Sequence, residues 1–318
     1  MVRFLLFGFA FALSGIANSQ PLLTPAELAA RASDPQLRIV DIRAARASDG
    51  APESSPAYDK GHIVGALSAP YGKWRGPKEN PGRLPEINAL TDLVRSLGID
   101  ARTPVVVVYE GTDATEFGAA ARVVWTLKAA GLSTLSILNG GMKAWRAAGQ
   151  PVTTAVVAVA PSQYMVRLDA DVIATQQQVA EVVAWHPERL LDARPSAYFR
   201  GETRHAAAQA PGTLVGAKNV EHDVWFVGGS AVLQSPDEIR RVAAREGVDT
   251  EQPTVSFCNT GHWAATNWFV LSEVLGQKNV RLYPESMVGW SAAGLPMANV
   301  PSRLAQFWLQ LKEATGTL

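Results

Sequence analysis

The sequence predicts an α/β protein made of two similar domains in tandem, each a mostly parallel sheet flanked by helices. Three observations support this: a length of 318 residues, a set of segments that occurs twice, and short apolar runs that alternate with helical patterns. A chain of this length fits roughly two domains of about 150 residues, because a single core seldom grows much larger. The hydrophobic content of 47% is enough to form both cores.

The repeated segments occur in the same order in each half. The first half contains LLTPAELAA, IVDIR, GHIVGA and LNGGMKAWRAAGQPV, and the second contains LDADVIATQQQVAEV, LLDAR, GTLVGA and YPESMVGWSAAGLPM. Asp41 and Asp192 are 151 residues apart, and Trp145 and Trp290 are 145 apart. Matched spacing over this length indicates a duplicated domain.

The apolar runs within each half have the length of buried strands. They occupy residues 37–42, 105–109 and 135–138, then 190–193, 254–257 and 280–283, while residues 119–130 have a helical pattern. Strands that alternate with helices are typical of a parallel sheet covered on both faces. We expect domains at residues 20–151 and 164–318, joined by a linker at residues 152–163.

The first 19 residues are typical of a secretory signal peptide. Arg3 is followed by an apolar run from Phe4 to Leu13 and by the small residues Ala17 and Ser19. The run is too short to span a bilayer of about 30 Å, so a membrane anchor is the weaker alternative and stable membrane insertion is not expected. We expect cleavage after Ser19 and a periplasmic or secreted product.

The charge balance and the cysteine count narrow the function classes. The formal net charge is zero, which disfavours nucleic acid or an anionic membrane as the partner. One cysteine, Cys258, excludes an internal disulfide, and no P-loop or GxGxxG pattern suggests a nucleotide cofactor. The histidines are scattered, so neither a metal nor another cofactor is expected; they are His62, His186, His205, His222 and His262.

Cys258 stands where an apolar run meets a short turn and a helical pattern, in TVSFCNTGHWAATNWFVLSEVLG. We expect the backbone N–H groups of residues 259–264 to turn inward, and the helix to add the positive end of its dipole. Both effects favour a thiolate and, later, a persulfide. Gly261 supplies the conformational freedom of such a turn. The alternative is a buried cysteine that packs as a small hydrophobic residue.

These motifs together resemble those of tandem rhodanese-domain sulfurtransferases, the family of thiosulfate and 3-mercaptopyruvate sulfurtransferases. The shared features are the Asp-x-Arg elements, GHIVGA and GTLVGA, the cysteine-led loop, and the closing GGMKAW and VGW segments. The resemblance implies an inactive first domain and a second-domain cysteine that passes sulfur from a donor to a thiophilic acceptor such as cyanide or a thiol. It also implies that the loop binds substrate through Asn259, Thr260, Gly261, His262, Trp263 and Ala264.

Two departures from the family pattern concern the substrate. Thiosulfate-using members commonly carry basic residues after the cysteine, whereas Asn259 and Thr260 are neutral, as in mercaptopyruvate-using members. Many members have a second arginine four positions beyond the equivalent of Arg194, and here that residue is Tyr198. Binding of an anionic donor would then fall to the loop amides, with Arg200 or Arg194 as substitutes.

Several of these residues have two interpretations. We match Cys258 with Glu110 in the first half, where a carboxylate cannot carry a sulfane sulfur, so that half is expected to be catalytically silent and to form one wall of the cleft. His262 could act in catalysis, by tuning the thiolate or relaying a proton, or simply be solvated. Trp263 could line the pocket or cover the loop. Arg194 is expected to pair with Asp192.

Two other functions compete with sulfur transfer. A cysteine phosphatase needs an arginine six positions after the cysteine to bind phosphate, but Ala264 occupies that position. A non-enzymatic binding or sulfur-relay protein remains the alternative, in which Cys258 accepts sulfur only from a protein partner.

Overall fold

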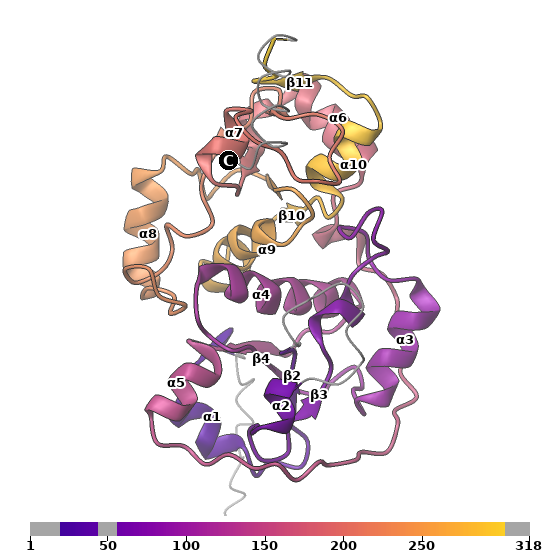
Figure 1. The fold of residues 1–318 in the computed structure, drawn as a ribbon, viewed down its shortest axis with the longest axis vertical. Coiled ribbons are helices and arrows are strands. Elements are labelled where there is room, and N and C mark those ends of the chain that lie inside the picture. The colour runs from indigo at the N-terminus through magenta and orange to yellow at the C-terminus, as the bar shows by residue number, and fades with distance from the viewer. Residues whose placement is uncertain (1–19, 44–55, 303–318) are drawn as a thin grey trace, which may run out of the picture.

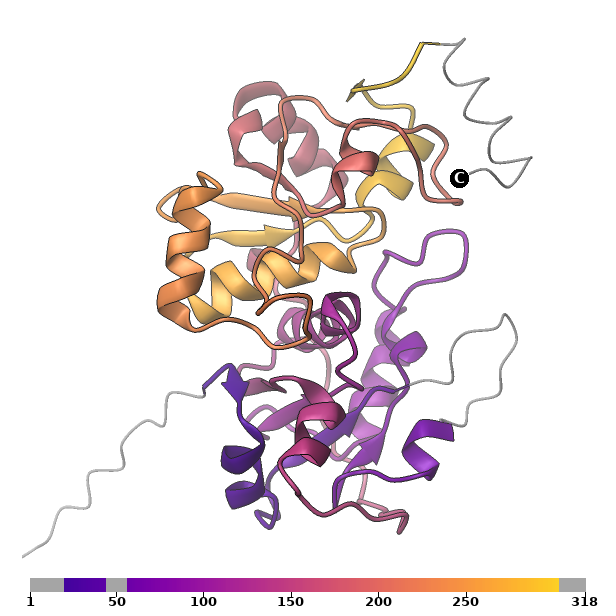
Figure 2. The same ribbon diagram turned by 60° about the vertical axis from the view of Figure 1, so that its left-hand side comes forward.

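The computed structural model describes residues 20–43 and 56–302, so the expected signal peptide lies outside the described residues. The two halves of the chain form two lobes stacked along the long axis (Figure 1). Helix α4 of the first lobe lies along the boundary, and α9 of the second lobe lies beside it in both views (Figures 1 and 2). Within the described residues, no helix is both long enough and apolar enough to cross a bilayer.

The described part of the first lobe contains a sheet of five parallel strands and the helices that flank it. Its strands are β1 (Leu22–Leu23), β2 (Arg38–Asp41), β3 (Leu67–Ser68), β4 (Val105–Val108) and β5 (Leu135–Leu138). Its helices are α1 (Pro25–Arg31), α2 (Pro56–Asp59), η1 (Tyr71–Trp74), α3 (Ile87–Ser96), α4 (Ala114–Ala129) and α5 (Gly141–Ala147). Strands β4 and β5 are buried at every residue, which explains their continuous apolar sequence.

The second lobe repeats this succession. Its strands are β6 (Leu190–Asp192), β7 (Thr213–Leu214), β8 (Lys218–Asn219), β9 (Thr254–Phe257), β10 (Val280–Leu282) and β11 (Met297–Ala298). Its helices are η2 (Ala170–Val172), α6 (Gln176–Trp185), η3 (Pro187–Arg189), α7 (Ser196–Phe199), α8 (Pro236–Arg245), α9 (Trp263–Trp268), η4 (Phe269–Val274) and α10 (Ser286–Ala292).

Strand order confirms the duplication. The first sheet has the order β1-β5-β4-β2-β3, and the second has β10-β9-β6-β8. Ile173 forms a parallel bridge with Leu282 of β10, in the place that β1 takes beside β5. The antiparallel pair β7–β11 is likewise matched by an antiparallel bridge between His62 and Thr153. The prediction of two α/β domains with mostly parallel sheets is therefore confirmed.

The six predicted strands are confirmed to within one residue at every end, but helix α4 begins earlier than expected. The sequence pattern predicted its start at residue 119, whereas α4 starts at Ala114. The reason is a helix cap, because the carboxylate of Asp113 accepts the backbone N–H of Glu116 at 2.9 Å. The additional turn brings Thr115 and Phe117 to the boundary between the lobes.

One hydrophobic cluster extends through both lobes. Phe117 of α4 is fully buried, and its ring makes edge contacts with Phe226 and Phe269 of the second lobe at centroid distances of 5.2 and 5.7 Å. Such aromatic contacts stabilise beyond the area that they bury. The lobes are therefore joined by a continuous core.

We expect Phe117→Ala to lower the free energy of unfolding by about 3–5 kcal/mol, because it leaves a cavity in this shared core. Urea denaturation followed by tryptophan fluorescence measures the change. Val156→Ala is the control: Val156 is 75% exposed, and its truncation should cost less than about 0.5 kcal/mol. Equal stability of Phe117→Ala and the parent protein would contradict a shared core.

Candidate active site

Cys258 directly follows β9, a strand buried at every residue and flanked by β10 and β6. The cysteine is 1% exposed. Ligand sites of parallel sheets lie at the carboxyl ends of the strands, and this is where the loop 258–262 begins. Because α9 follows the loop and packs on α4, the loop lies at the boundary between the two lobes (Figure 1).

The match of Cys258 with Glu110 in the first half is wrong by one residue. The N–H of Met142 donates to the carbonyl of Tyr109, and the N–H of Met287 donates to that of Cys258 in the same way. Tyr109 is therefore the equivalent of Cys258. The offset between the repeats shrinks from 151 to 145 residues along the domain, so sequence spacing alone does not fix which residue is equivalent to Cys258. A buried tyrosine cannot carry a sulfane sulfur either.

Glu110 is instead the equivalent of Asn259. Arg43 Nη1 donates to Glu110 Oε2 at 3.0 Å, and Arg194 Nη1 donates to Asn259 Oδ1 at 3.3 Å. The second domain thus has a neutral amide where the first has a carboxylate. This exchange removes a negative charge from the residue next to the sulfur.

The Asp-x-Arg elements form buried ion pairs, as predicted. Arg194 and Asp192 are joined at 2.6 Å, and Arg43 and Asp41 at 2.7 Å, with side chains at most 2% exposed. Arg194 also donates to the carbonyl of Gly212 at 2.8 Å. With its guanidinium held in this way, Arg194 is placed to bind the side chain of Asn259 in the cysteine loop.

Ser286 is a loop contact that the sequence interpretation missed. Its hydroxyl accepts the N–H groups of Cys258 at 3.0 Å and Gly261 at 3.2 Å, and donates to the carbonyl of Tyr283 at 2.8 Å. Ser286 has φ +49°, and its equivalent Gly141 has φ +59°. The expectation that the loop N–H groups all turn inward towards the sulfur is thus corrected, because the Gly261 N–H donates to the Ser286 hydroxyl instead. The signal in the sequence that could have identified Ser286 is a serine where the first half of the repeat has a glycine, Gly141.

We expect Ser286→Gly to keep the backbone conformation and to leave two buried N–H groups without an acceptor. Modification of Cys258 by a sulfur donor should slow by about tenfold or more, measured by stopped-flow or quenched mass spectrometry. Ser291→Ala, on the same helix α10, is the control. An unchanged rate in Ser286→Gly would show that the hydroxyl does not order the loop.

His262 joins the loop to the first domain. Its Nε2 lies 2.8 Å from the carbonyl of Thr115, and its Nδ1 lies 2.7 Å from the hydroxyl of Tyr71. A carbonyl only accepts, so Nε2 is assigned the proton and Nδ1 accepts from Tyr71. Arg75 in turn donates to the Tyr71 hydroxyl at 2.7 Å. Both ring nitrogens are used, so His262 bridges the domains, a role that neither sequence interpretation included.

Burial, and after it the positive charges of Arg75 and other neighbours, lowers the pKa of His262 to about 3. The ring is therefore neutral near pH 7. Since the unfolded chain binds a proton below its ordinary pKa of 6.5 and the folded chain does not, stability is lost as pH falls from about 6.5 towards 3.

We expect the free energy of unfolding to fall by about 1–2 kcal/mol more in the parent than in His262→Gln between pH 7 and pH 5. Burial also lowers the pKa of His222 and of His205, and these contributions remain in both proteins. Urea titrations at the two pH values measure the difference. Identical pH dependence in both proteins would show that His262 binds a proton as readily in the folded state as in the unfolded chain, and would contradict this assignment.

Three aromatic side chains lie beside the loop. Trp263 stacks on His222 with ring centroids 4.9 Å apart, and Tyr198 meets Trp263 edge-on at 5.9 Å. Tyr198, the residue in place of the family's second arginine, therefore lies near the loop. Trp263 is partly exposed, as is Tyr198. His222 is 5% exposed and was not among the predicted site residues.

The other predicted substrate-binding residues have varied environments. Arg200 is exposed and forms an ion pair with Glu202 at 2.6 Å, so its place in a cleft stays a prediction. Ala264 is fully buried, and its carbonyl accepts the hydroxyl of Ser256 in β9. Thr260 is 7% exposed. Its carbonyl accepts hydrogen bonds from Arg75 and Arg122 of the first domain, and no pattern in the sequence indicated these contacts.

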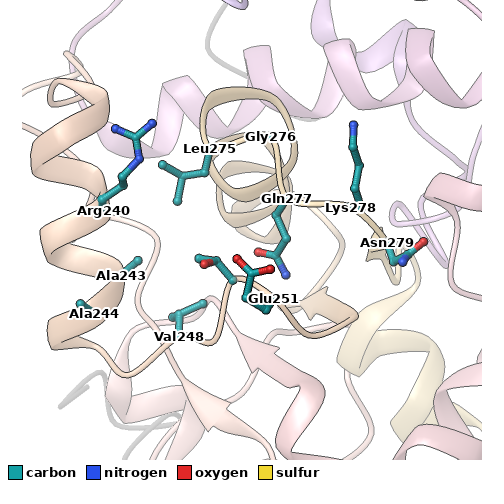
Figure 3. A pocket seen from close by; sticks show the side chains of 11 residues that line it. Arg240, Ala243, Ala244, Val248, Glu251, Leu275, Gly276, Gln277, Lys278 and Asn279 are labelled. Carbon is teal, nitrogen blue, oxygen red and sulfur yellow. The ribbon is translucent and has the colours of Figure 1, made fainter.

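A separate pocket lies at the opposite edge of the second sheet. Its volume is about 500 Å³ (Figure 3). It is lined from the end of α8 and from the segments that precede β9 and β10, at the amino ends of the strands, whereas Cys258 stands at a carboxyl end. Gln277, Arg240 and Lys278 contribute side chains to it. This pocket does not belong to the cysteine site.

Known proteins resemble this chain in sequence. The model of the rhodanese-like domain matches residues 24–148 and 175–293. A putative thiosulfate sulfurtransferase of Mycolicibacterium smegmatis is 30% identical over 257 residues, which cover 77% of this chain and 88% of that protein. The 3-mercaptopyruvate sulfurtransferase of Rattus norvegicus is 29% identical over 215 residues, covering 67% and 71% of the two chains.

Solved structures share the fold. SseA of Escherichia coli, a 3-mercaptopyruvate sulfotransferase, superposes with a TM-score of 0.71 at 24% identity, covering 84% of this chain and 98% of that one. The sulfur transferase subunit of yeast mitochondrial complex I has a TM-score of 0.72 at 23% identity, with coverages of 88% and 99%. The chain therefore belongs to the rhodanese family, and its class is that of the tandem-domain sulfurtransferases.

Proposed function

We propose that this protein transfers a sulfane sulfur through a persulfide on Cys258. The observation that carries the proposal is the position of this cysteine: it follows a buried central strand in a loop to which both domains contribute hydrogen bonds. The family relationship supports the same chemistry, because relatives of similar length are named sulfurtransferases.

The first step is a displacement at sulfur. With thiosulfate, the Cys258 thiolate attacks the outer sulfur, the S–S bond of the donor breaks, and sulfite leaves with the electron pair. The total negative charge is the same before and after, since one thiolate becomes one persulfide anion. With 3-mercaptopyruvate the C–S bond breaks instead, and the electron pair leaves on carbon as the enolate of pyruvate, which is then protonated.

The second step returns the cysteine to its starting state. A nucleophile such as cyanide or a thiol attacks the outer sulfur of the persulfide, and the electron pair of the S–S bond returns to the Cys258 sulfur as thiolate. The product is thiocyanate or a persulfide of the acceptor. The persulfide survives between the two steps only if water and oxidants are kept away, and the 1% exposure of Cys258 favours this.

We favour 3-mercaptopyruvate over thiosulfate as the better donor. Asn259 and Thr260 are neutral, and Tyr198 stands in place of the family's second arginine, close to Trp263. A dianionic donor gains less from such a loop than a donor that also carries a polar keto group. We also propose that residues 1–19 direct export, so that the enzyme acts in the periplasm or outside the cell.

Thiocyanate production from cyanide tests this function. The mature protein and its Cys258→Ser variant are assayed with thiosulfate and with 3-mercaptopyruvate in parallel. We expect turnover that is faster with 3-mercaptopyruvate by about tenfold, equivalent to about 1.4 kcal/mol of differential binding, and no turnover in the variant.

The outcomes separate the competing functions. Equal turnover by Cys258→Ser would exclude the cysteine as nucleophile. A faster reaction with thiosulfate would keep the sulfurtransferase and overturn the donor preference. No turnover with either donor would overturn the small-molecule enzyme and favour a sulfur-relay protein that accepts sulfur from a protein partner.

A further inference from the structure

The carbonyl of Thr260, in the middle of the cysteine loop, is held by two arginines of the first domain. Arg75 Nη2 donates to it at 3.0 Å, and Arg122 Nη1 donates to it at 3.3 Å. The same peptide unit continues into the N–H of Gly261, which donates to the hydroxyl of Ser286. Both ends of this peptide are thus fixed, one by the first domain and one by the second.

Arg122 lies so close to the loop that residue 261 has no room for a side chain. Gly261 has φ +68°, and a Cβ atom there would lie 2.5 Å from Arg122 Nη1. Arg122 lies in α4, is fully buried, and packs over the ring of Trp125 at 4.7 Å. Its Nη2 donates to the carbonyl of Gly82 at 2.7 Å. The guanidinium is therefore enclosed between the first domain and the loop.

The positive charges of both arginines lack a carboxylate partner. In residues 20–43 and 56–302, neither Arg75 nor Arg122 forms an ion pair, whereas the buried Arg43 and Arg194 pair with Asp41 and Asp192. A buried cation without a counter-ion is costly to the fold. Such a cost is expected where the charge serves a function.

Two acidic groups act on the charge of Arg122, the phenol of Tyr71 and the thiol of Cys258. Burial, and then the charge of Arg75, lowers the pKa of Arg122 to about 9, and negative charge on Tyr71 and on Cys258 acts in the opposite direction. A pKa of about 9 leaves the guanidinium charged at neutral pH. A negative charge that forms on the Cys258 sulfur is therefore attracted by Arg122.

We propose that Arg122 and Arg75 are positioning residues of the active site, which order the cysteine loop through the Thr260 carbonyl and stabilise negative charge on the Cys258 sulfur. The neutral loop would then obtain its positive charge from the first domain. The catalytic part of this inference rests on the proposed function. It gives the first domain, which has no nucleophile, a direct part in the chemistry.

Charge variants of the full mature protein test the proposal. Arg122→Met and Arg75→Met remove the charge, Arg122→Lys and Arg75→Lys keep it, and Arg95→Met is the matched control. Arg95 also lies in the first domain and donates to a backbone carbonyl, that of Tyr164, at 2.7 Å. Circular dichroism and urea denaturation establish which variants fold. If Arg122→Met does not fold, Arg75→Met provides the test, because Arg75 is only partly buried.

Two readouts are compared at pH 7. The first is the ultraviolet absorbance of the Cys258 thiolate, with Cys258→Ser as the blank, which requires no sulfur donor. The second is the single-turnover rate of persulfide formation. We expect each folded Met variant to lose about threefold or more in thiolate absorbance and about tenfold or more in rate, the Lys variants to recover most of both, and Arg95→Met to match the parent.

Thiolate absorbance within about 1.5-fold of the parent in the folded Met variants, or Lys variants no better than Met variants, would overturn the proposal. If the parent itself forms no persulfide, the proposed function fails, but the absorbance still decides whether the arginines favour the thiolate. The two failures are therefore distinguishable.

Discussion

The packing of α4 against α9 is the constraint on which the cysteine site depends. These helices follow equivalent strands of the two sheets, so their contact places both strand-end loops at one boundary. The loop after β9 is then shaped from two sides, by Ser286 of its own domain and by Tyr71, Thr115, Arg75 and Arg122 of the other. A second domain isolated from the first would lose the latter set and expose Phe269 of the shared core.

Duplication followed by divergence explains the division of roles. The two sheets have the same strand order, the same buried Asp–Arg pairs, and the same capping threonines, Thr24 and Thr175. Three differences lie at or against the cysteine loop: Tyr109 against Cys258, Glu110 against Asn259, and Gly141 against Ser286. Each exchange in the second domain has a chemical consequence, since it adds a thiol, removes a carboxylate, or adds a hydroxyl that accepts two loop amides.

The sequence predicted the fold well because its signals are local or periodic. Buried strands such as β4 and β5 have continuous apolar sequences, and the repeat displayed the domain twice. Cys258 was identified because it is the single cysteine and stands between a strand and a helix pattern.

The rest of the site could not be predicted because its contacts join distant parts of the chain. His262 and Tyr71 are 191 residues apart, and Arg75 and Thr260 are 185 apart. No local pattern distinguishes Arg75 or Arg122 from a surface arginine. Tyr109 was missed for a different reason, since a change in loop length alters the offset between the repeats by several residues.

The most direct test of the account is to trap the sulfur. The protein is mixed with one donor in the absence of any acceptor, and its intact mass and the masses of its peptides are measured. We expect a mass increase of one sulfur atom per chain, located on the peptide that contains Cys258 and released by cyanide. Sulfur bound elsewhere, or no added sulfur with a donor that the protein nevertheless consumes, would contradict it.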